Sequence, residues 1–289
     1  MRKDYTVEQL CHVIGVSRSG YYAYLKRPLK ESSERDLKDM AAIQNLFNEN
    51  GGTYGAKRIA GELRTRDHIV NHKRVARLMK EMNLKSRIRG VKSKKEEKTK
   101  SAGYVYPNLL DRDFNATLPN RRWVTDMSEL IVKNVKFYIS ALMDLYNREI
   151  IAFVVSDSPN TALIDETIRT AMETRGLTDL KNVIIHSDQG SVYRSYDHYK
   201  LSKELEFITS MSRKANCWDN AVIESFFSHL KTEFPHLFSV NSAEQVIEDL
   251  SKFITYFNEK RSQKRLGYLT PVSFLNVKIK QVNAQLCAV

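Results

Sequence analysis

The pattern of apolar and polar positions changes character about a third of the way along the chain. Up to residue 85, apolar residues recur at helical spacing. Two short helices are expected in residues 6–25, where Thr6 with Gln9, and then Ser17, are suited to cap their starts. Three further helices are predicted, over residues 36–49, 54–65 and 71–83. The first third therefore reads as an all-α region that resembles a helix-turn-helix.

From residue 121 onward the pattern favours strands. Three β-rich runs, joined in part by a short turn at Asn147 and Arg148, predict an antiparallel meander over residues 121–130, 136–146 and 149–157. The order then continues with a helix (160–175), a strand (182–188), a helix (195–205), a strand (206–211), a helix (218–233) and a last helix from Ser242, with Gln245 as its capping partner, to about residue 260. Five strands with interspersed helices predict an α/β domain with a mixed sheet.

Polar stretches without periodicity set the predicted boundaries. Residues 91–101 (VKSKKEEKTKS) and the segment around Pro28 are typical of linkers. The expected units are a helix-turn-helix-like segment (1–28), a three-helix basic DNA-binding domain (36–90), a flexible linker (91–118), a catalytic core (119–262) and a C-terminal tail (263–289).

Charge is concentrated in the first third. The net charge is +12, and residues 1–100 hold 24 Lys and Arg residues against 12 Asp and Glu residues, whereas residues 101–289 hold 22 of each. In the helix at 71–83, an apolar face lies opposite a basic one. The candidate DNA-binding residues are Lys57, Arg58, Lys73, Arg74, Arg77 and Lys80. This distribution predicts an arm that binds a polyanion; a solvated charged surface is the alternative.

Composition argues against membrane and secreted proteins. No apolar run reaches the ~18 residues of a membrane span, and the first ten residues hold no apolar leader region. The three cysteines are far apart and predict neither a disulfide framework nor a zinc site. A cytoplasmic protein is therefore expected.

The predicted helix at 218–233 carries two stripes. At 100° per residue, Ile223, Phe226, Phe227 and Leu230 form an apolar stripe, and Asn220, Glu224, Ser228 and Lys231 form a polar one beside it. Asp219 or Asn220 is expected to cap the helix. Glu224 and Lys231 are either an ordinary salt bridge at the edge of a packed helix or a carboxylate and an ammonium directed at a site.

Three acids are candidates for a site. Asp126 lies inside the first predicted strand, Asp188 ends the fourth, and Glu224 follows Asp188 with 35 residues between them. A carboxylate within an apolar strand is unfavourable unless it is paired or binds a metal. Converging carboxylates are suited to Mg²⁺ or Mn²⁺, and two such ions can support phosphoryl transfer. The alternative is that each acid serves as a separate cap or ion-pair partner.

Several stretches resemble the OrfB-type transposases of the insertion-sequence three family, whose core is similar to retroviral integrase. They are YGAKRIAGEL (54–63), NHKRVARLMKEMNL (71–84), WVTDMSEL (123–130), HSDQGSVY (186–193), SMSRKANCWDNAVIESFFSHLKTE (210–233) and YFNEKRSQKRLGYLTPVSF (256–274). They occur in family order and extend over most of residues 36–275.

The resemblance implies an RNase H-like fold, the integrase catalytic-core fold, in which Asp126, Asp188 and Glu224 form the catalytic triad and Lys231 accompanies it. It also implies DNA cleavage at the ends of an insertion element, dependent on Mg²⁺ or Mn²⁺ with two ions in the site, followed by strand transfer from a 3′-hydroxyl. The expected partners are the terminal repeats, target DNA, further copies of the chain on DNA, and an upstream-frame protein (OrfA) that is often fused by frameshifting. A bacterial, nucleoid-associated protein is implied.

Other residues keep two interpretations. His186 could reach the metal site or be structural, and Trp123 and Trp218 could stack on bases or be buried. Asp144 and Asp157 are weaker acidic candidates. Residues 260–265 (KRSQKR) could contact phosphates or end a helix in solvent. Alternative functions are a catalytically silent DNA-binding regulator, an inhibitor of the full-length transposase, and an RNase H-like nuclease.

Overall fold

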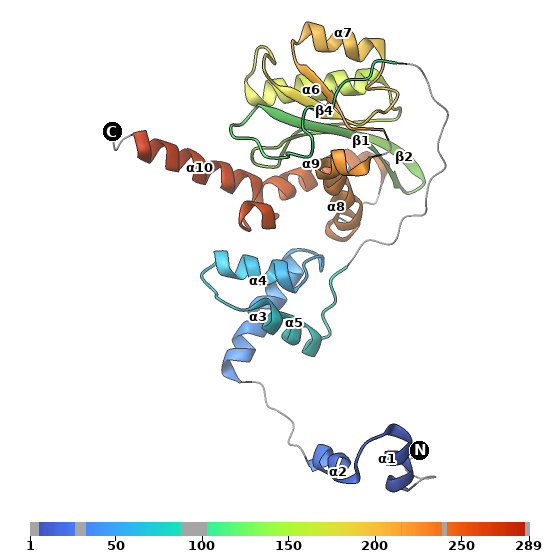
Figure 1. Ribbon diagram of the computed structural model, residues 1–289, viewed down its shortest axis with the longest axis vertical. Coiled ribbons are helices and arrows are strands. Elements are labelled where there is room, and N and C mark those ends of the chain that lie inside the picture. The colour runs from blue at the N-terminus through green and yellow to red at the C-terminus, as the bar shows by residue number, and fades with distance from the viewer. Residues whose placement is uncertain (1–5, 27–32, 88–102, 215, 239–241, 287–289) are drawn as a thin grey trace.

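A computed structural model describes residues 6–26, 33–87, 103–214, 216–238 and 242–286 of the chain (Figure 1). The predicted linker at 91–101 and the segment around Pro28 lie outside the described residues. Residues 103–121, which lead into the sheet, form turns and irregular structure without a helix or strand.

The first two helices, α1 (Val7–Ile14) and α2 (Arg18–Lys26), confirm the prediction for residues 6–25. The Thr6 hydroxyl accepts a hydrogen bond from the Gln9 amide at 3.3 Å, and the Gln9 side chain accepts one from the Thr6 amide at 2.9 Å. The Ser17 hydroxyl accepts from the Gly20 amide at 3.1 Å at the start of α2. Both expected caps are therefore present.

The next three helices form a small domain of their own. They are α3 (Glu34–Glu49), α4 (Ala56–Thr65) and α5 (His72–Glu81). Their apolar faces meet around Ile43, Ile59 and Val75, each of which is fully buried. The apolar spacing that predicted the helices is thus the spacing that buries their inner faces.

The rest of the chain is built on a five-stranded sheet in the order β3-β2-β1-β4-β5. The strands are β1 (Arg122–Val132), β2 (Val135–Asp144), β3 (Glu149–Ser156), β4 (Ile184–Ser187) and β5 (Ile208–Met211). Strands β1, β2 and β3 pair antiparallel, which confirms the predicted meander, whereas β4 and β5 are parallel to β1. The sheet is therefore mixed, as predicted.

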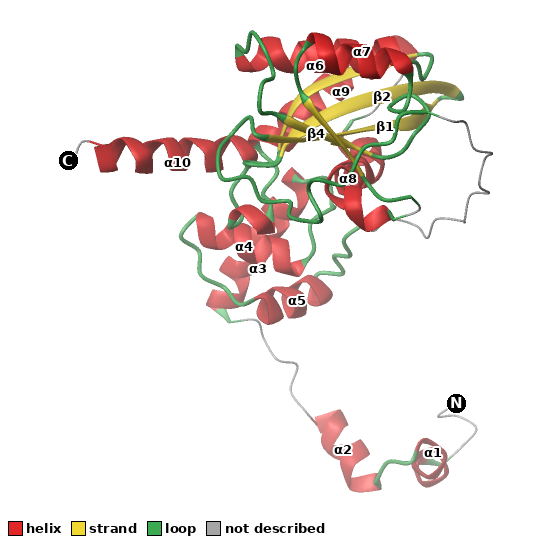
Figure 2. Ribbon diagram, turned by 45° about the horizontal axis from the view of Figure 1, so that its top comes forward, coloured by secondary structure: helices red, strands yellow, loops and turns green. Residues whose placement is uncertain are grey.

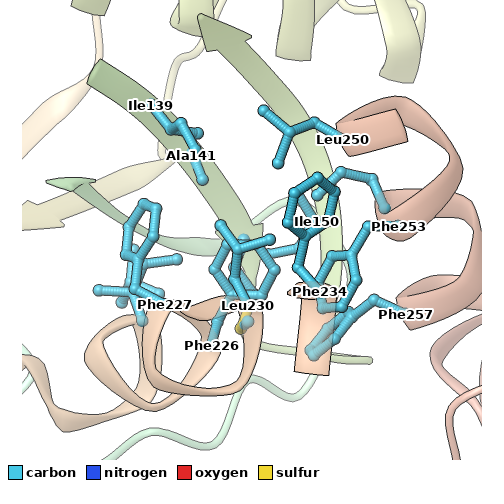
Figure 3. Close-up of a cluster of buried hydrophobic side chains, with 14 of the residues drawn as sticks. Ile139, Ala141, Ile150, Phe226, Phe227, Leu230, Phe234, Leu250, Phe253 and Phe257 are labelled. Carbon is cyan, nitrogen blue, oxygen red and sulfur yellow. The ribbon is translucent and has the colours of Figure 1, made fainter. Parts of the chain in front are cut away.

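Helices cover both faces of this sheet (Figure 2). On one face, α6 (Thr161–Arg175) and α7 (Tyr196–Glu204) pack on a core that includes Trp123. On the other face, α8 (Ala221–Leu237) and α9 (Ala243–Glu259) pack on a core that includes Val124. Because successive strand residues point to opposite faces, β1 contributes to both cores. Figure 3 shows the second core, where α8 and α9 bring phenylalanines against Ile139, Ala141 and Ile150.

Some predicted details differ from the structure. A 3₁₀ turn, η1 (Cys217–Asn220), precedes α8, so the helix begins three residues later than predicted. Asn220 occupies the N-cap, but its side chain makes no capping hydrogen bond, and Asp219 is buried elsewhere. Ser242 likewise stands at the N-cap of α9 without a side-chain capping bond. The predicted N-cap positions are therefore confirmed at Asn220 and Ser242, but the capping hydrogen bonds expected from their side chains are absent.

The segment after residue 262, expected as a tail, contains regular structure. A short 3₁₀ turn, η2 (Lys264–Leu266), leads to α10 (Pro271–Leu286). The helix extends away from the sheet in both ribbon views (Figures 1 and 2). Of the helices in the described part of the chain, none has the length and apolarity that a membrane span requires.

The three-helix domain is docked on the sheet domain. The Tyr256 hydroxyl of α9 donates to the Asn50 side chain at 2.8 Å, and the Ser262 amide donates to the Tyr54 hydroxyl at 3.1 Å. Gly61 of α4 lies under the Tyr268 ring so closely that a Cβ there would be 2.2 Å from ring atoms. These contacts join α3 and α4 to the segment around the end of α9.

Candidate active site

Asp126 lies on the central strand of the sheet. It is opposite Ala141 of β2 and two residues from Val124, so its side chain points to the face that α8 covers. The carboxyl is half-buried, and its Oδ1 accepts a hydrogen bond from the Met127 amide at 2.8 Å. Because strand residues alternate between the two faces, the carboxyl group of Asp126 lies on the same face as Val124, between the sheet and α8.

Asp188 reaches the same place from the neighbouring strand. Strands β1 and β4 are parallel, with Val124 paired to His186, and the same register continued by two residues sets Asp126 beside Asp188, whose charge acts on Asp126. Asp188 comes directly after β4, and its Oδ1 accepts from the Gly190 amide at 2.8 Å. A Cβ on Gly190 would lie 2.8 Å from that same oxygen, so a residue without a side chain is suited to this turn.

Helix α8 supplies the third acid and a lysine. Its predicted apolar stripe is buried on the sheet, with Ile223, Phe226 and Leu230 each no more than 1% exposed. Glu224 and Lys231 lie beside that stripe and are exposed. Because the stripe fixes the rotation of the helix, it also fixes the side from which Glu224 and Lys231 approach the aspartates.

The charges of these four groups act on one another. Burial, followed by the charge of Asp188, raises the pKa of Asp126 to about 8; the Glu224 charge adds to the rise, while the Met127 amide and Lys231 oppose it. Burial also raises the pKa of Asp188, against the hydrogen bond from Gly190. The fold therefore brings Asp188, Glu224 and Lys231 within electrostatic reach of Asp126. Among the residues described, no three His, Cys, Asp or Glu side chains are gathered as a metal-binding group.

Tyr193 is a neighbour that sequence reasoning missed. Its ring is 2% exposed, and its hydroxyl lies 3.4 Å from that of Thr125, next to Asp126 in the chain. Burial raises the pKa of Tyr193, and the charges of Asp126 and Asp188 contribute. Tyr193 therefore remains a neutral phenol beneath the two aspartates. The sequence signal that could have identified Tyr193 is its position five residues after Asp188, in the segment that follows β4.

Comparisons with known proteins agree with this architecture. Residues 34–92 match the HTH-like domain, and residues 116–217 and 224–279 match two models of the integrase core domain. The chain is 35% identical to the putative transposase InsK for insertion sequence element IS150 of Escherichia coli (strain K12), over 96% of this chain and 95% of that protein. This chain belongs to the insertion-sequence transposases.

A second transposase is also similar to this chain. The transposase InsF for insertion sequence IS3A of Escherichia coli (strain K12) is 29% identical, over 94% of this chain and 95% of that protein. A chain in the structure of the simian T-cell lymphotropic virus intasome is similar with a TM-score of 0.49 and 15% identity, over 74% of this chain and 73% of that one. The integrase core models and the transposase relatives confirm the predicted resemblance to OrfB-type transposases, and the mixed five-stranded sheet flanked by helices confirms the predicted fold class.

The other polar candidates of this transposase have separate places. His186 is fully buried, its Nδ1 lies 2.8 Å from the Ser210 hydroxyl, and burial lowers its pKa to about 4, so it is a neutral core residue. Asp144 is fully buried and accepts from the amides of Asn120 and Tyr146, at 2.9 and 3.0 Å. Asp157 is exposed at the end of β3. None of the three contributes to the raised pKa of Asp126.

The two tryptophans differ. Trp123 is fully buried in the core under α6, whereas Trp218 is 69% exposed in the turn before α8. The buried interpretation is therefore confirmed for Trp123 and wrong for Trp218. An indole in solvent, six residues before Glu224, is available for stacking on a base.

Asp219 has a role that the sequence did not reveal. It is fully buried and accepts from the side chains of Arg213 at 2.7 Å, Arg112 at 3.0 Å and Asn108 at 3.0 Å. The hydrogen bond from Arg213, first among several causes, holds the pKa of Asp219 far below its usual range. This cluster fixes the turn that leads into α8, and with it the position of Glu224.

The candidate DNA-binding residues are divided by their partners. Arg74 and Arg77 of α5 form ion pairs with Asp36 of α3, at 2.8 and 2.7 Å, and Arg74 also pairs with Asp39 at 2.7 Å. Their guanidinium groups thus serve the packing of α5 on α3. The lysines Lys57, Lys73 and Lys80 are exposed, and no ion pair involves them within the described ranges. Arg58 is turned toward the sheet domain, 3.7 Å from Glu233.

Proposed function

We propose that Asp126, Asp188 and Glu224 form the catalytic centre of a DNA transposase that cleaves the ends of its insertion element and joins a freed 3′-hydroxyl to target DNA. The observation that carries the proposal is the coupling of these acids. Parallel strands set two aspartates side by side, α8 brings a glutamate to them, and the pKa of Asp126 rises to about 8 as a result of burial and their charge. Such mutual repulsion is typical of a cation site.

The donor set fits a hard divalent cation. Asp126, Asp188 and Glu224 offer only carboxylate oxygens, the ligands that Mg²⁺ and Mn²⁺ prefer. The described carboxylates do not yet surround one point, but Glu224 is exposed and its side chain can change rotamer. When bound, two such ions lower the pKa of an attacking water or hydroxyl and stabilise the departing oxygen.

The chain's own residues supply the remaining requirements. Lys231 lies on the Glu224 side of α8, where its ammonium lowers the repulsion among the acids and can bind a phosphate oxygen. Helices α4 and α5 provide a surface for the DNA backbone through the exposed residues Lys57, Lys73 and Lys80. Pairing of two element ends calls for more than one copy of the chain on DNA, and an upstream-frame partner remains part of the proposal.

The test is cleavage of duplex DNA that carries the repeats flanking the gene at its source locus, with MgCl₂. We expect Asp126→Asn, Asp188→Asn and Glu224→Gln each to lower the cleavage rate by about three orders of magnitude or more. Asp157→Asn is the matched control, because Asp157 is an exposed strand-end aspartate outside the cluster. Full cleavage by the Asp188→Asn variant would contradict the proposal.

The same protein distinguishes the alternative functions. A silent regulator or inhibitor would bind the repeat DNA without cleaving it under any divalent cation. An RNase H-like nuclease would cut an RNA–DNA hybrid of the same sequence faster than the DNA duplex. A DNA transposase is expected to produce 3′-hydroxyl ends on the duplex and to join them to a second DNA in the same reaction.

A further inference from the structure

A basic cavity of about 450 Å³ lies where the three-helix domain meets the sheet domain. Basic residues from four separate parts of the chain line it: Arg58 of α4, Arg112 before β1, Arg148 of the β2–β3 turn, and Lys264 with Arg265 after α9. The described residues that line it include no Asp or Glu. Such a concentration of positive charge in one concave place indicates an anion as its ligand.

The cavity is separate from the carboxylate site. Helix α8 contributes Val222, Ser225 and His229 to the cavity wall, and Glu224 and Lys231 to the carboxylate side. At 100° per residue, these two sets point in directions about 140° apart around the helix. The body of α8 therefore stands between the cavity and the acids.

Arg148 is the residue that most needs a ligand there. Its side chain is 8% exposed, and one Nη donates to the Phe114 carbonyl at 3.0 Å. No carboxylate pairs with it within the described residues. Burial, followed by the charge of Arg265, lowers the pKa of Arg148 to about 10, so the group stays charged at neutral pH. A buried guanidinium without a counter-ion is unfavourable, and a bound anion would relieve it.

The other cations of the cavity fall into two groups. Arg261 and Arg58 both lie against Glu233, at 2.7 and 3.7 Å, and Arg112 is paired with Asp219 at 3.0 Å. Burial lowers the pKa of His229 to about 3, so none of these four groups adds free positive charge. Lys264 and Arg265 are exposed at the rim. The Arg265 guanidinium donates a hydrogen bond to the side-chain oxygen of Asn115. The uncompensated charge therefore comes from the buried Arg148 guanidinium at the wall and from two exposed cations, Lys264 and Arg265, at the mouth.

We propose that this cavity binds a phosphate of the DNA backbone, on the side of α8 away from the carboxylates. The proposal rests on the proposed function only in taking DNA as the polyanion. A guanidinium fork with flanking cations matches the two free oxygens of a phosphodiester. The cavity opens between the basic helical domain and the sheet domain, where a duplex held by exposed lysines of α4 and α5 can extend onto the sheet domain.

The first test measures DNA binding by the full chain as a function of salt. The probe is a fluorescent 30-base-pair duplex of random sequence, without divalent cation. The Lys264→Gln/Arg265→Gln double variant should reduce the salt slope by roughly one to two units, since each lost phosphate contact removes about 0.9. The matched control is Lys200→Gln/Lys203→Gln on α7, which removes the same charge from exposed positions across the sheet. Equal slopes for the cavity variant and the wild type, or equal losses in both double variants, would overturn the proposal.

A second variant tests the buried guanidinium. Because Arg148 has no carboxylate partner, Arg148→Met should leave the melting temperature of the DNA-free protein at or above that of the wild type. The same variant should bind the duplex about tenfold more weakly at 0.15 M salt. A lowered melting temperature with unchanged DNA affinity would assign Arg148 a purely structural role.

Two further arms identify the ligand and separate the proposals. Inorganic phosphate, at an ionic strength matched with chloride, should stabilise the wild type only weakly; strong stabilisation that Lys264→Gln/Arg265→Gln abolishes, with DNA binding intact, would assign the cavity to a free anion. Asp188→Asn should keep the wild-type salt slope while cleavage is lost. If Lys264→Gln/Arg265→Gln shows the expected smaller salt slope of DNA binding than the wild type, but the wild type does not cleave DNA, the catalytic proposal alone is rejected.

Discussion

Helix α8 carries two glutamates that lie in opposite electrostatic surroundings. Glu224 and Glu233 are nine residues apart, which places them about 180° apart around the helix. Glu233 is 3% exposed and receives two hydrogen bonds from Arg261, at 2.7 and 2.8 Å. Burial acts to raise the pKa of Glu233, but the bonds and charge of Arg261 outweigh it and leave the pKa below its usual value.

On the Glu224 side the charges oppose one another. There the neighbours are two aspartates, and the pKa of Asp126 is raised to about 8, with burial as the largest cause. One side of the helix is thus neutralised by Arg261, whereas on the other side Lys231 offsets only part of the repulsion that raises the pKa of Asp126. The Glu233 side of α8 therefore stabilises the fold, whereas the acids on the Glu224 side lower its stability, as is common at functional sites. Three substitutions would sharpen or break this contrast.

The largest effect is expected at Glu233. Glu233→Gln leaves Arg261, 2% exposed, without its counter-ion, so the free energy of unfolding should fall by about 3–5 kcal/mol. Urea unfolding followed by circular dichroism measures it. Glu224→Gln on the same helix should change the free energy of unfolding by no more than about 0.5 kcal/mol. Comparable losses in both variants would remove the contrast.

An intermediate effect is expected at Asp126 in protein without divalent cations. Its pKa is raised in the fold, so the unfolded chain releases this proton first as the pH rises from about 4, and stability falls until about pH 8. Asp126→Asn lacks this loss and should be more stable than the wild type at pH 8, by about 1–3 kcal/mol after solvent screening.

The pH dependence provides the control for that result. At pH 4 the wild-type carboxyl is protonated in the fold, so the stability difference between Asp126→Asn and the wild type should nearly vanish. Asp157→Asn, at an exposed position, should show no such dependence. A constant difference between pH 4 and pH 8 would mean that the substitution acts through packing.

The smallest effect is expected at Lys231. Its ammonium lowers the pKa of Asp126, so Lys231→Gln should shift the acid limb of the rate of DNA cleavage to higher pH, because a protonated carboxyl cannot bind a cation. The measurement is kcat/KM between pH 6 and 9, with Lys203→Gln of α7 as the control for a lost surface charge. An unchanged acid limb would place Lys231 outside the electrostatic unit.

Much of the fold could be predicted because burial leaves a periodic record. The alternation through Trp123, Val124 and Asp126 marks a strand that contacts two cores, and the stripe of Ile223, Phe226 and Leu230 marks the inner side of α8. Each pattern involves one element and its buried side, so it can be read from neighbouring residues alone.

Features that depend on distant partners could not be predicted in this way. Asp219 looks like a helix cap, but Arg213, Arg112 and Asn108 take its oxygens, and two of these residues are more than a hundred positions away. Arg74 and Arg77 lie on the polar side of α5, yet the sequence does not show that Asp36 faces them. A local pattern identifies a polar face without identifying what that face meets.

The candidate site was accessible from the sequence only in part. The three acids, Asp126, Asp188 and Glu224, could be identified from their spacing and from the family resemblance. The parallel register of β1 and β4, which brings the two aspartates together, has no signature in the local sequence. The basic cavity escaped notice for the same reason, since Arg58, Arg148 and Arg265 meet only when the two domains dock.

The docking of the three-helix domain has a geometric consequence for the DNA. Hydrogen bonds from Tyr256 to Asn50 and from Ser262 to Tyr54 join the ends of α3 and α4 to α9 and the residues after it. Helix α9 follows α8, the helix that carries Glu224. In the proposed complex, the DNA backbone bound by the exposed lysines of α4 and α5 and the bond to be broken are therefore held at a set separation. Base pairs inserted between these two places would leave the cut at its original distance from the bound stretch, so the new break would fall within different nucleotides.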